Sequence, residues 1–142
     1  MGEPAARRIL VSWRSVLLVF VGGVVGTAVR ESIVLVTAAS VHGRWAVLAV
    51  NLAGAFALGL LVSLLSSRDE SERRRDVRFL VGVGALGGFT TYSALAVDVA
   101  ARLADDPSGA LAYGILSLAG GLVSAALGLA AGRRRAKPGV VR

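Results

Sequence analysis

The residues with the clearest chemical potential are polar groups inside long apolar stretches. Asn51 lies within the uncharged stretch 45–65. An unsatisfied amide is expensive in hydrocarbon, so this side chain must face protein, a pore, or both. Its NH2 group can donate a hydrogen bond to an anion, and it can equally tie two helices together. The residue type alone leaves both roles open.

A second set of polar residues follows a glycine-rich segment. The sequence FTTYS at 89–93 comes directly after four glycines, at Gly82, Gly84, Gly87 and Gly88. This density of glycine predicts a broken helix. Backbone groups freed by a break inside a bilayer need partners, so breaks persist inside protein or beside a watery or ionic site. The segment is therefore the strongest indication of a functional centre.

Other polar side chains lie near the ends of apolar stretches. Arg30 can raise the local concentration of anions, or it can extend its charge to the membrane surface. Asp98 can face a vestibule or cap its segment. Tyr113 and Ser117 are four residues apart, so their hydroxyls share one helix face and can line a polar track. A tyrosine near a helix end is also a common interfacial anchor.

Membrane-spanning helices must position these groups, because the 142-residue chain is 55% hydrophobic with a mean hydropathy of +0.70. Each of four apolar stretches is close to the roughly 20 residues that cross a bilayer. We predict one all-α integral membrane domain over residues 1–142, with the charged segment 66–78 as an aqueous loop and helices at about 15–40, 45–65, 79–103 and 110–132. Gly22 and Gly26 have the GxxxG spacing that favours close helix packing.

Composition excludes several classes of function. The chain has no cysteine and a single histidine, His42, so it lacks the residues for disulfides, thiolate metal sites and Cys–His nucleophiles. We therefore do not expect an enzyme. The net charge of +7 does not indicate a nucleic-acid partner, because the basic residues flank apolar stretches, where they meet membrane lipid.

The distribution of basic residues predicts an orientation. With four spans, both termini and the segment 66–78 share one side of the membrane, and 13 of the 16 Lys and Arg residues lie there. The other side carries Arg30, Arg44 and Arg102. The positive-inside rule then places both termini in the cytoplasm. A protein that inserts both ways would have a balanced count, so a fixed orientation is predicted.

Three motifs, in this order along the chain, resemble the fluoride channel family known as Fluc or CrcB. GGVVGTAVR at 22–30 resembles the family's Gly-Gly…Gly…Arg opening. NLAGAF at 51–56 resembles its Asn…Gly-Ser-Phe element, and GGFTTYS at 87–93 resembles its Gly-Gly-Phe-Thr-Thr-Phe-Ser. Together the motifs occur on the first three predicted spans.

The resemblance implies an antiparallel, dual-topology-type dimer in the cell membrane, with two pores that export fluoride passively and so reduce cytoplasmic fluoride. It implies a structural sodium ion, not transported, held at the dimer centre by the main-chain carbonyls of Gly87 and Thr90. The family's two pore phenylalanines correspond to Tyr92 and Leu95. The other fluoride positions carried over are Asn51, Ser93, Arg30, Asp98, Tyr113 and Ser117.

This chain departs from the family pattern at Tyr92 and Leu95, and at Ala94, which replaces the threonine that often precedes the second phenylalanine. Tyr92 retains an aromatic ring edge, whereas Leu95 has none. With the charge asymmetry, this predicts a heterodimer with a homologous subunit of opposite orientation, which would supply the missing ring. The alternatives are a non-conducting subunit that needs such a partner, a helical scaffold, and a small proton-coupled multidrug-type transporter. The transporter requires a membrane-embedded carboxylate, and Glu31 is the nearest candidate.

Overall fold

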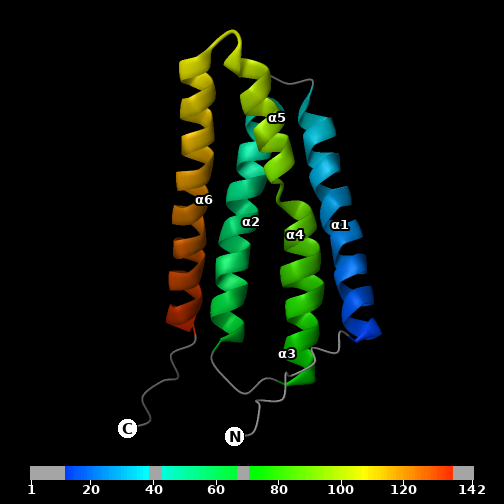
Figure 1. Ribbon diagram of the computed structural model, residues 1–142. Helices are drawn as coiled ribbons and strands as arrows, with labels where there is room; N and C mark the ends of the chain where they lie inside the picture. Colours follow the sequence, from blue (N-terminus) through cyan, green and yellow to red (C-terminus); the bar gives the residue numbers. More distant parts are fainter. Residues whose placement is uncertain (1–11, 39–42, 67–70, 136–142) are drawn as a thin grey trace, which may run out of the picture.

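The computed structural model describes residues 12–38, 43–66 and 71–135, and all the regular secondary structure in these ranges is helical. Four rods run side by side (Figure 1). The third rod consists of several consecutive segments. The elements are α1 (Trp13–Ala38), α2 (Gly43–Leu65), α3 (Glu72–Val77), η1 (Arg78–Leu86), α4 (Gly87–Phe89), α5 (Tyr92–Leu103) and α6 (Pro107–Arg135).

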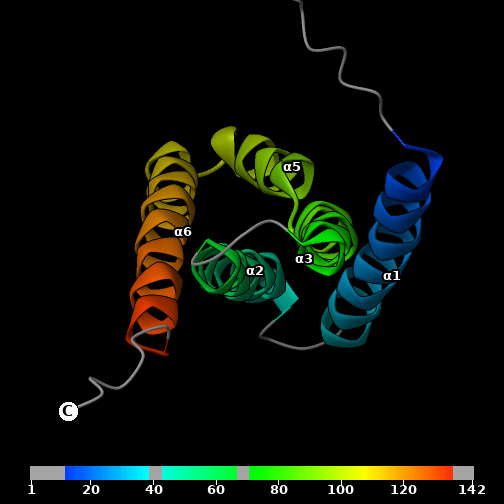
Figure 2. The same ribbon diagram turned by 90° about the horizontal axis from the view of Figure 1, so that it is seen from below.

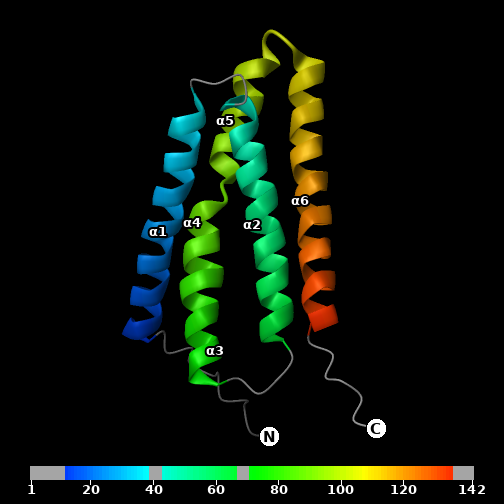
Figure 3. The same ribbon diagram turned by 180° about the vertical axis from the view of Figure 1, so that it is seen from behind.

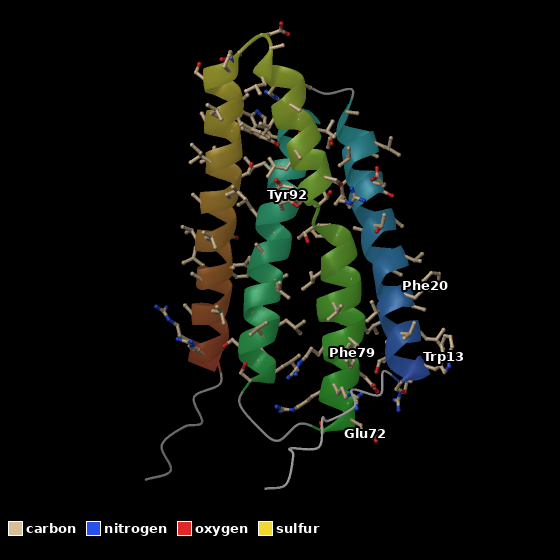
Figure 4. All side chains as sticks on the ribbon, in the orientation of Figure 1. Trp13, Phe20, Glu72, Phe79 and Tyr92 are labelled. Atoms are coloured by element: carbon tan, nitrogen blue, oxygen red, sulfur yellow. The ribbon has the colours of Figure 1, made fainter. Side chains whose placement is uncertain are left out.

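The four rods are long and apolar enough to cross a membrane. Helices form here despite many β-branched residues, because a lipid-embedded backbone must satisfy its own hydrogen bonds. Large apolar side chains such as Trp13 and Phe20 project outward from α1 (Figure 4) and are 80% and 67% exposed. Such exposure suits contact with lipid. The chain is therefore an all-helical, multi-pass membrane protein.

The third helix begins at Glu72, so the predicted start at about residue 79 was wrong, and residues 72–78 of the predicted loop are helical. Ser71 has an extended backbone, and its carbonyl accepts hydrogen bonds from the N–H groups of Arg74 and Arg75. Arginine and glutamate are good helix formers, and Glu72 favours the positive end of the helix dipole. Hydropathy marks where a helix meets hydrocarbon, whereas hydrogen bonding decides where it begins. Residues 67–70 of the predicted loop lie outside the described residues.

The helices pack as two close pairs, α1 with η1 and α4, and α2 with α6 (Figure 2). A Cβ atom on Gly22 would overlap the Leu80 carbonyl, and one on Gly26 would overlap the Ala85 carbonyl. The packing predicted from their GxxxG spacing is thus confirmed. The pair α2 and α6 makes the same kind of contact, with the backbone of Phe56 against Gly128. In lipid, small residues allow this close backbone approach.

The third rod is interrupted between α4 and α5 (Figure 3). Thr90 has φ −83° and ψ 153°, and Thr91 has φ −147° and ψ 127°, so both residues are extended. Before the interruption, η1 is a π-helix, whose wider turns often mark functional positions. The interruption therefore leaves backbone polar groups outside the regular helical pattern at the level of the apolar rods.

Candidate functional site

The centre of the candidate site is the contact between Asn51 and the interruption. Asn51 Nδ2 donates to the Thr91 carbonyl at 2.9 Å, and Asn51 Oδ1 accepts from the Thr91 N–H at 2.8 Å. Of the two roles that the sequence left open, the tie between helices is therefore present. The tie uses one of the two amide hydrogens, so the same side chain keeps a donor for another acceptor.

The interruption also starts α5. The Thr91 hydroxyl accepts a hydrogen bond from the Ala94 N–H at 3.3 Å, which is the geometry of an N-cap. Ser93 lies in the first turn of α5, with its Oγ 3.1 Å from the Thr91 Oγ. The positive end of the helix dipole and an exposed hydroxyl therefore coincide at Ser93.

The carbonyl groups before the interruption differ in their partners. The Leu86 carbonyl accepts from both the N–H and the hydroxyl of Thr90, at 3.0 and 2.9 Å. The Gly88 carbonyl accepts a long hydrogen bond of 3.4 Å from the Thr27 hydroxyl on α1. Gly87 lies between them, and a Cβ atom there would meet no atom of the described residues within 4 Å. Its backbone therefore has open space on one side.

A groove with a volume of about 1080 Å³ runs along α2, the third rod and α6. Six of the predicted site residues line it, namely Asn51, Gly87, Thr90, Tyr92, Leu95 and Ser117. Most of the remaining wall is apolar, from Leu58, Leu61, Val62, Leu65, Val83, Leu86, Leu118 and Leu122. The polar residues are thus few and lie on a largely apolar surface.

Tyr92 and Leu95, the positions of the expected ring pair, differ in exposure. Tyr92, just after the interruption (Figure 4), is 76% exposed, so its ring is available to a group outside this chain. Leu95 is 6% exposed and packs within the chain. A phenylalanine ring at position 95, at the wall of the groove, would therefore have to displace existing contacts.

A second cluster surrounds Tyr113 on α6. The Tyr113 hydroxyl donates to Asp98 Oδ2 at 3.4 Å, and the Arg102 guanidinium lies 5.2 Å from the centre of the tyrosine ring. The Trp45 ring lies 6.1 Å from the same ring, centre to centre. The sequence interpretation missed Arg102 and Trp45. The spacing of Asp98 and Arg102, four residues apart on one helix, was the available signal for the arginine.

Ser117 is one turn further along α6 and has a different environment. Its Oγ is buried and has no hydrogen-bond partner within the described part of the chain. An unsatisfied buried hydroxyl costs free energy, and such groups in native proteins often have a functional reason. Ser117 therefore places, at the wall of the groove, a hydroxyl with no hydrogen bond of normal length to any described residue.

Arg30 is paired with its neighbour in sequence. Its Nη1 lies 3.1 Å from Glu31 Oε1, and the arginine side chain is 17% exposed. The Arg30 Nε is buried and has no partner among the described residues. Among the described residues, Arg30 has no hydrogen bond to Asn51, Tyr113 or Ser117. Most of the predicted site residues therefore lie along the groove or around Tyr113, whereas Arg30 belongs to neither group.

Comparison with known proteins gives one consistent family. The family described as "CrcB-like protein, Camphor Resistance (CrcB)" matches residues 17–129. The "Fluoride-specific ion channel FluC 2" of Leifsonia xyli subsp. xyli is 46% identical over 130 residues, which cover 86% of this chain and 88% of the relative. The "Fluoride-specific ion channel FluC" of Chelativorans sp. is 41% identical over 121 residues, covering 80% and 91%. These names are those of ion channels and not of enzymes.

Proposed function

The chain belongs to the CrcB family, and from that membership and the geometry of the groove we propose that it forms a fluoride-selective channel. Fluoride would leave the cell passively, down its electrochemical gradient. The observation that carries the proposal is the interrupted third rod, with Asn51 bound to Thr91 beside a largely apolar groove. A bilayer tolerates such an interruption inside protein or beside a polar path.

Selectivity would come from a few donors on a nearly dry path. The free amide hydrogen of Asn51 and the hydroxyls of Ser93 and Ser117 can replace part of the hydration shell of a small anion. The exposed ring of Tyr92 offers a positive edge. The apolar walls exclude water. This favours fluoride over chloride, because the fixed donors replace the hydration of the smaller anion better.

The charged residues would act at the ends of the path. The positive charges of Arg30 and Arg102 raise the local concentration of anions. Asp98 accepts the Tyr113 hydroxyl at 3.4 Å and so orients the ring that Arg102 covers. Asp98 is in this account a positioning residue for Tyr113.

A second subunit would close the groove. Large apolar residues on its wall are exposed in the single chain, with Tyr92 at 76%, Leu122 at 75% and Leu118 at 59%. An antiparallel partner would cover them and complete two pores. The 13 of 16 basic residues on one predicted side of the membrane favour a fixed orientation with both termini cytoplasmic. The partner is then a homologous chain of opposite orientation.

A structural sodium ion would lie where the two subunits meet, held by the main-chain carbonyls of Gly87 and Thr90. The residues fit this group, since carbonyl oxygens suit a hard cation and the backbone of Gly87 is open on one side. No group of three His, Cys, Asp or Glu side chains that could hold a metal occurs among residues 12–38, 43–66 and 71–135. The ion would supply fixed positive charge at the interface.

The test is fluoride efflux from liposomes that contain the full chain, alone or with a homologous partner, with chloride as the control anion. Fluoride-selective efflux in either preparation supports the channel. Efflux that requires the partner supports the alternative of a non-conducting subunit, which the buried Leu95 favours. Folded dimers without fluoride efflux in both preparations would contradict the proposal.

A further inference from the structure

A side chain from another helix holds the backbone of Thr91. Asn51 Oδ1 accepts the Thr91 N–H at 2.8 Å, and Asn51 Nδ2 donates to the Thr91 carbonyl at 2.9 Å. Asn51 lies on α2, 40 positions away in the sequence. One amide therefore satisfies both backbone polar groups of a residue that has left the helical pattern.

This pairing has a consequence for the carbonyl of Gly87. In an uninterrupted α-helix, the Thr91 N–H would donate to the carbonyl four residues earlier, which belongs to Gly87. Asn51 takes that N–H instead. The neighbouring Leu86 carbonyl is bonded twice by Thr90, and the Gly88 carbonyl accepts from Thr27. The N–H group that would bind the Gly87 carbonyl in a regular helix is thus bound by a side chain of α2.

The surroundings of Gly87 leave room for a ligand. A Cβ atom on Gly88 would lie 2.5 Å from the Gly23 carbonyl, so Gly88 is packed tightly against α1. Among residues 12–38, 43–66 and 71–135, no atom would lie within 4 Å of a Cβ atom on Gly87, and Gly87 lines the groove. A carbonyl whose helical donor is bound by Asn51 therefore belongs to a residue with open space.

We infer that Asn51 is a positioning residue for the cation site. By binding Thr91, it holds the third rod interrupted and keeps the Gly87 carbonyl available to a metal cation. This inference rests on the proposed function, which places a sodium ion at that carbonyl. The role is additional to lining the pore, because the pairing leaves one amide hydrogen free. The site is therefore shaped by the chain before the cation binds.

The test is thermal unfolding of a purified dimer that contains the full chain, formed with a homologous partner if one is required, as a function of sodium concentration. N-methylglucamine chloride keeps the ionic strength constant. The variant Asn51→Leu keeps the branching of the side chain at Cγ and removes both hydrogen bonds to Thr91. The matched control is Ser124→Ala, which removes a different interhelical hydrogen bond, from Ser124 Oγ to the Leu52 carbonyl at 2.7 Å.

Sodium should raise the Tm of the wild-type chain and of Ser124→Ala with the same midpoint. The midpoint for Asn51→Leu should rise about tenfold or more, which corresponds to ~1.4 kcal/mol, the scale of one to two net hydrogen bonds. An unchanged midpoint in Asn51→Leu would overturn the inference and leave the cation site standing. If sodium does not raise the Tm of the wild-type chain, both the positioning role of Asn51 and the proposed cation site are overturned.

A second measurement uses the wild-type chain and keeps the inference testable if Asn51→Leu does not fold. Amide hydrogen exchange at Thr91 is followed with and without sodium, from overlapping peptides. We expect the Thr91 N–H to stay protected in sodium-free buffer, because Asn51 holds it. Exchange as fast as that of an open turn after sodium removal would show that the cation shapes the interruption, and would overturn the inference.

Discussion

Replacing Ser117 with alanine should change stability and fluoride flux in opposite directions. Ser117 is 5% exposed, and its Oγ is buried without a hydrogen-bond partner in the described residues. The hydroxyl therefore carries a desolvation penalty with no compensating bond within the chain, on the order of 1–3 kcal/mol. Its removal should leave the free energy of unfolding unchanged or raise it by up to about 1 kcal/mol.

The fluoride flux should fall, because the Ser117 hydroxyl is proposed to donate a hydrogen bond to the permeating anion. A hydrogen bond to a charged group contributes about 1.5–3 kcal/mol. Its loss from the conducting path should reduce the rate of fluoride efflux by about 10- to 100-fold. The rate is measured with a fluoride electrode outside liposomes of matched protein content.

Ser124 provides the matched control on the same helix. Its Oγ donates to the Leu52 carbonyl at 2.7 Å, so its hydroxyl is satisfied by the chain. Ser124→Ala should lower the free energy of unfolding by about 0.6 kcal/mol, the average for interhelical hydrogen bonds in membranes, and leave the flux unchanged. The reasoning is refuted if Ser117→Ala conducts like the wild type, or if it is destabilised as much as Ser124→Ala.

Three further predictions concern packing, the ring pair and pH. Gly22→Ala should prevent close packing of α1 on η1 and reduce the yield of folded dimer in size-exclusion chromatography. The adjacent Gly23→Ala should be tolerated, because the nearest atom to its Cβ in the described part of the chain is the Gly84 carbonyl oxygen, 4.0 Å away. Leu95→Phe should cost about 1–3 kcal/mol by overpacking a buried site, and should raise fluoride efflux from the chain alone; equal efflux in a stable variant would contradict the role of the missing ring. The hydrogen bond from the Gly109 N–H, with help from the Ser108 hydroxyl, holds the pKa of Asp106 below its usual value of 3.8. A lowered pKa gives stability that is present above about pH 4 and is lost as the pH falls through the folded-state pKa. Asp106→Asn, which keeps an acceptor oxygen, should therefore show a smaller fall in Tm between pH 5 and 3 than the wild type, as measured by thermal unfolding.

The sequence was sufficient to predict the helical rods, because hydropathy and length are direct requirements of the bilayer. The glycine run drew attention to this part of the chain, where the extended residues Thr90 and Thr91 follow shortly after Gly88. Hydropathy could not locate the start of the third helix at Glu72. That start depends on hydrogen bonds to the Ser71 carbonyl among charged residues.

The site was less predictable, because its contacts join residues far apart in the sequence. Asn51 meets Thr91 across 40 positions, and no local pattern decides between an anion donor and a helix tie. Tyr113 and Ser117 share a helix face as expected, yet Tyr113 is bonded to Asp98, while the Ser117 hydroxyl has no hydrogen bond of normal length within the described part of the chain. The difference arises from the packing of α5 on α6, which a periodic pattern does not contain.

The most direct test of the central claim is the reversal potential across a planar bilayer that contains the folded dimer, formed with a homologous partner if one is required. The two chambers hold opposing gradients of sodium fluoride and sodium chloride. We predict a current that reverses at the equilibrium potential of fluoride and does not respond to the chloride gradient. A reversal potential that follows chloride, or no current from confirmed dimers, would contradict the account.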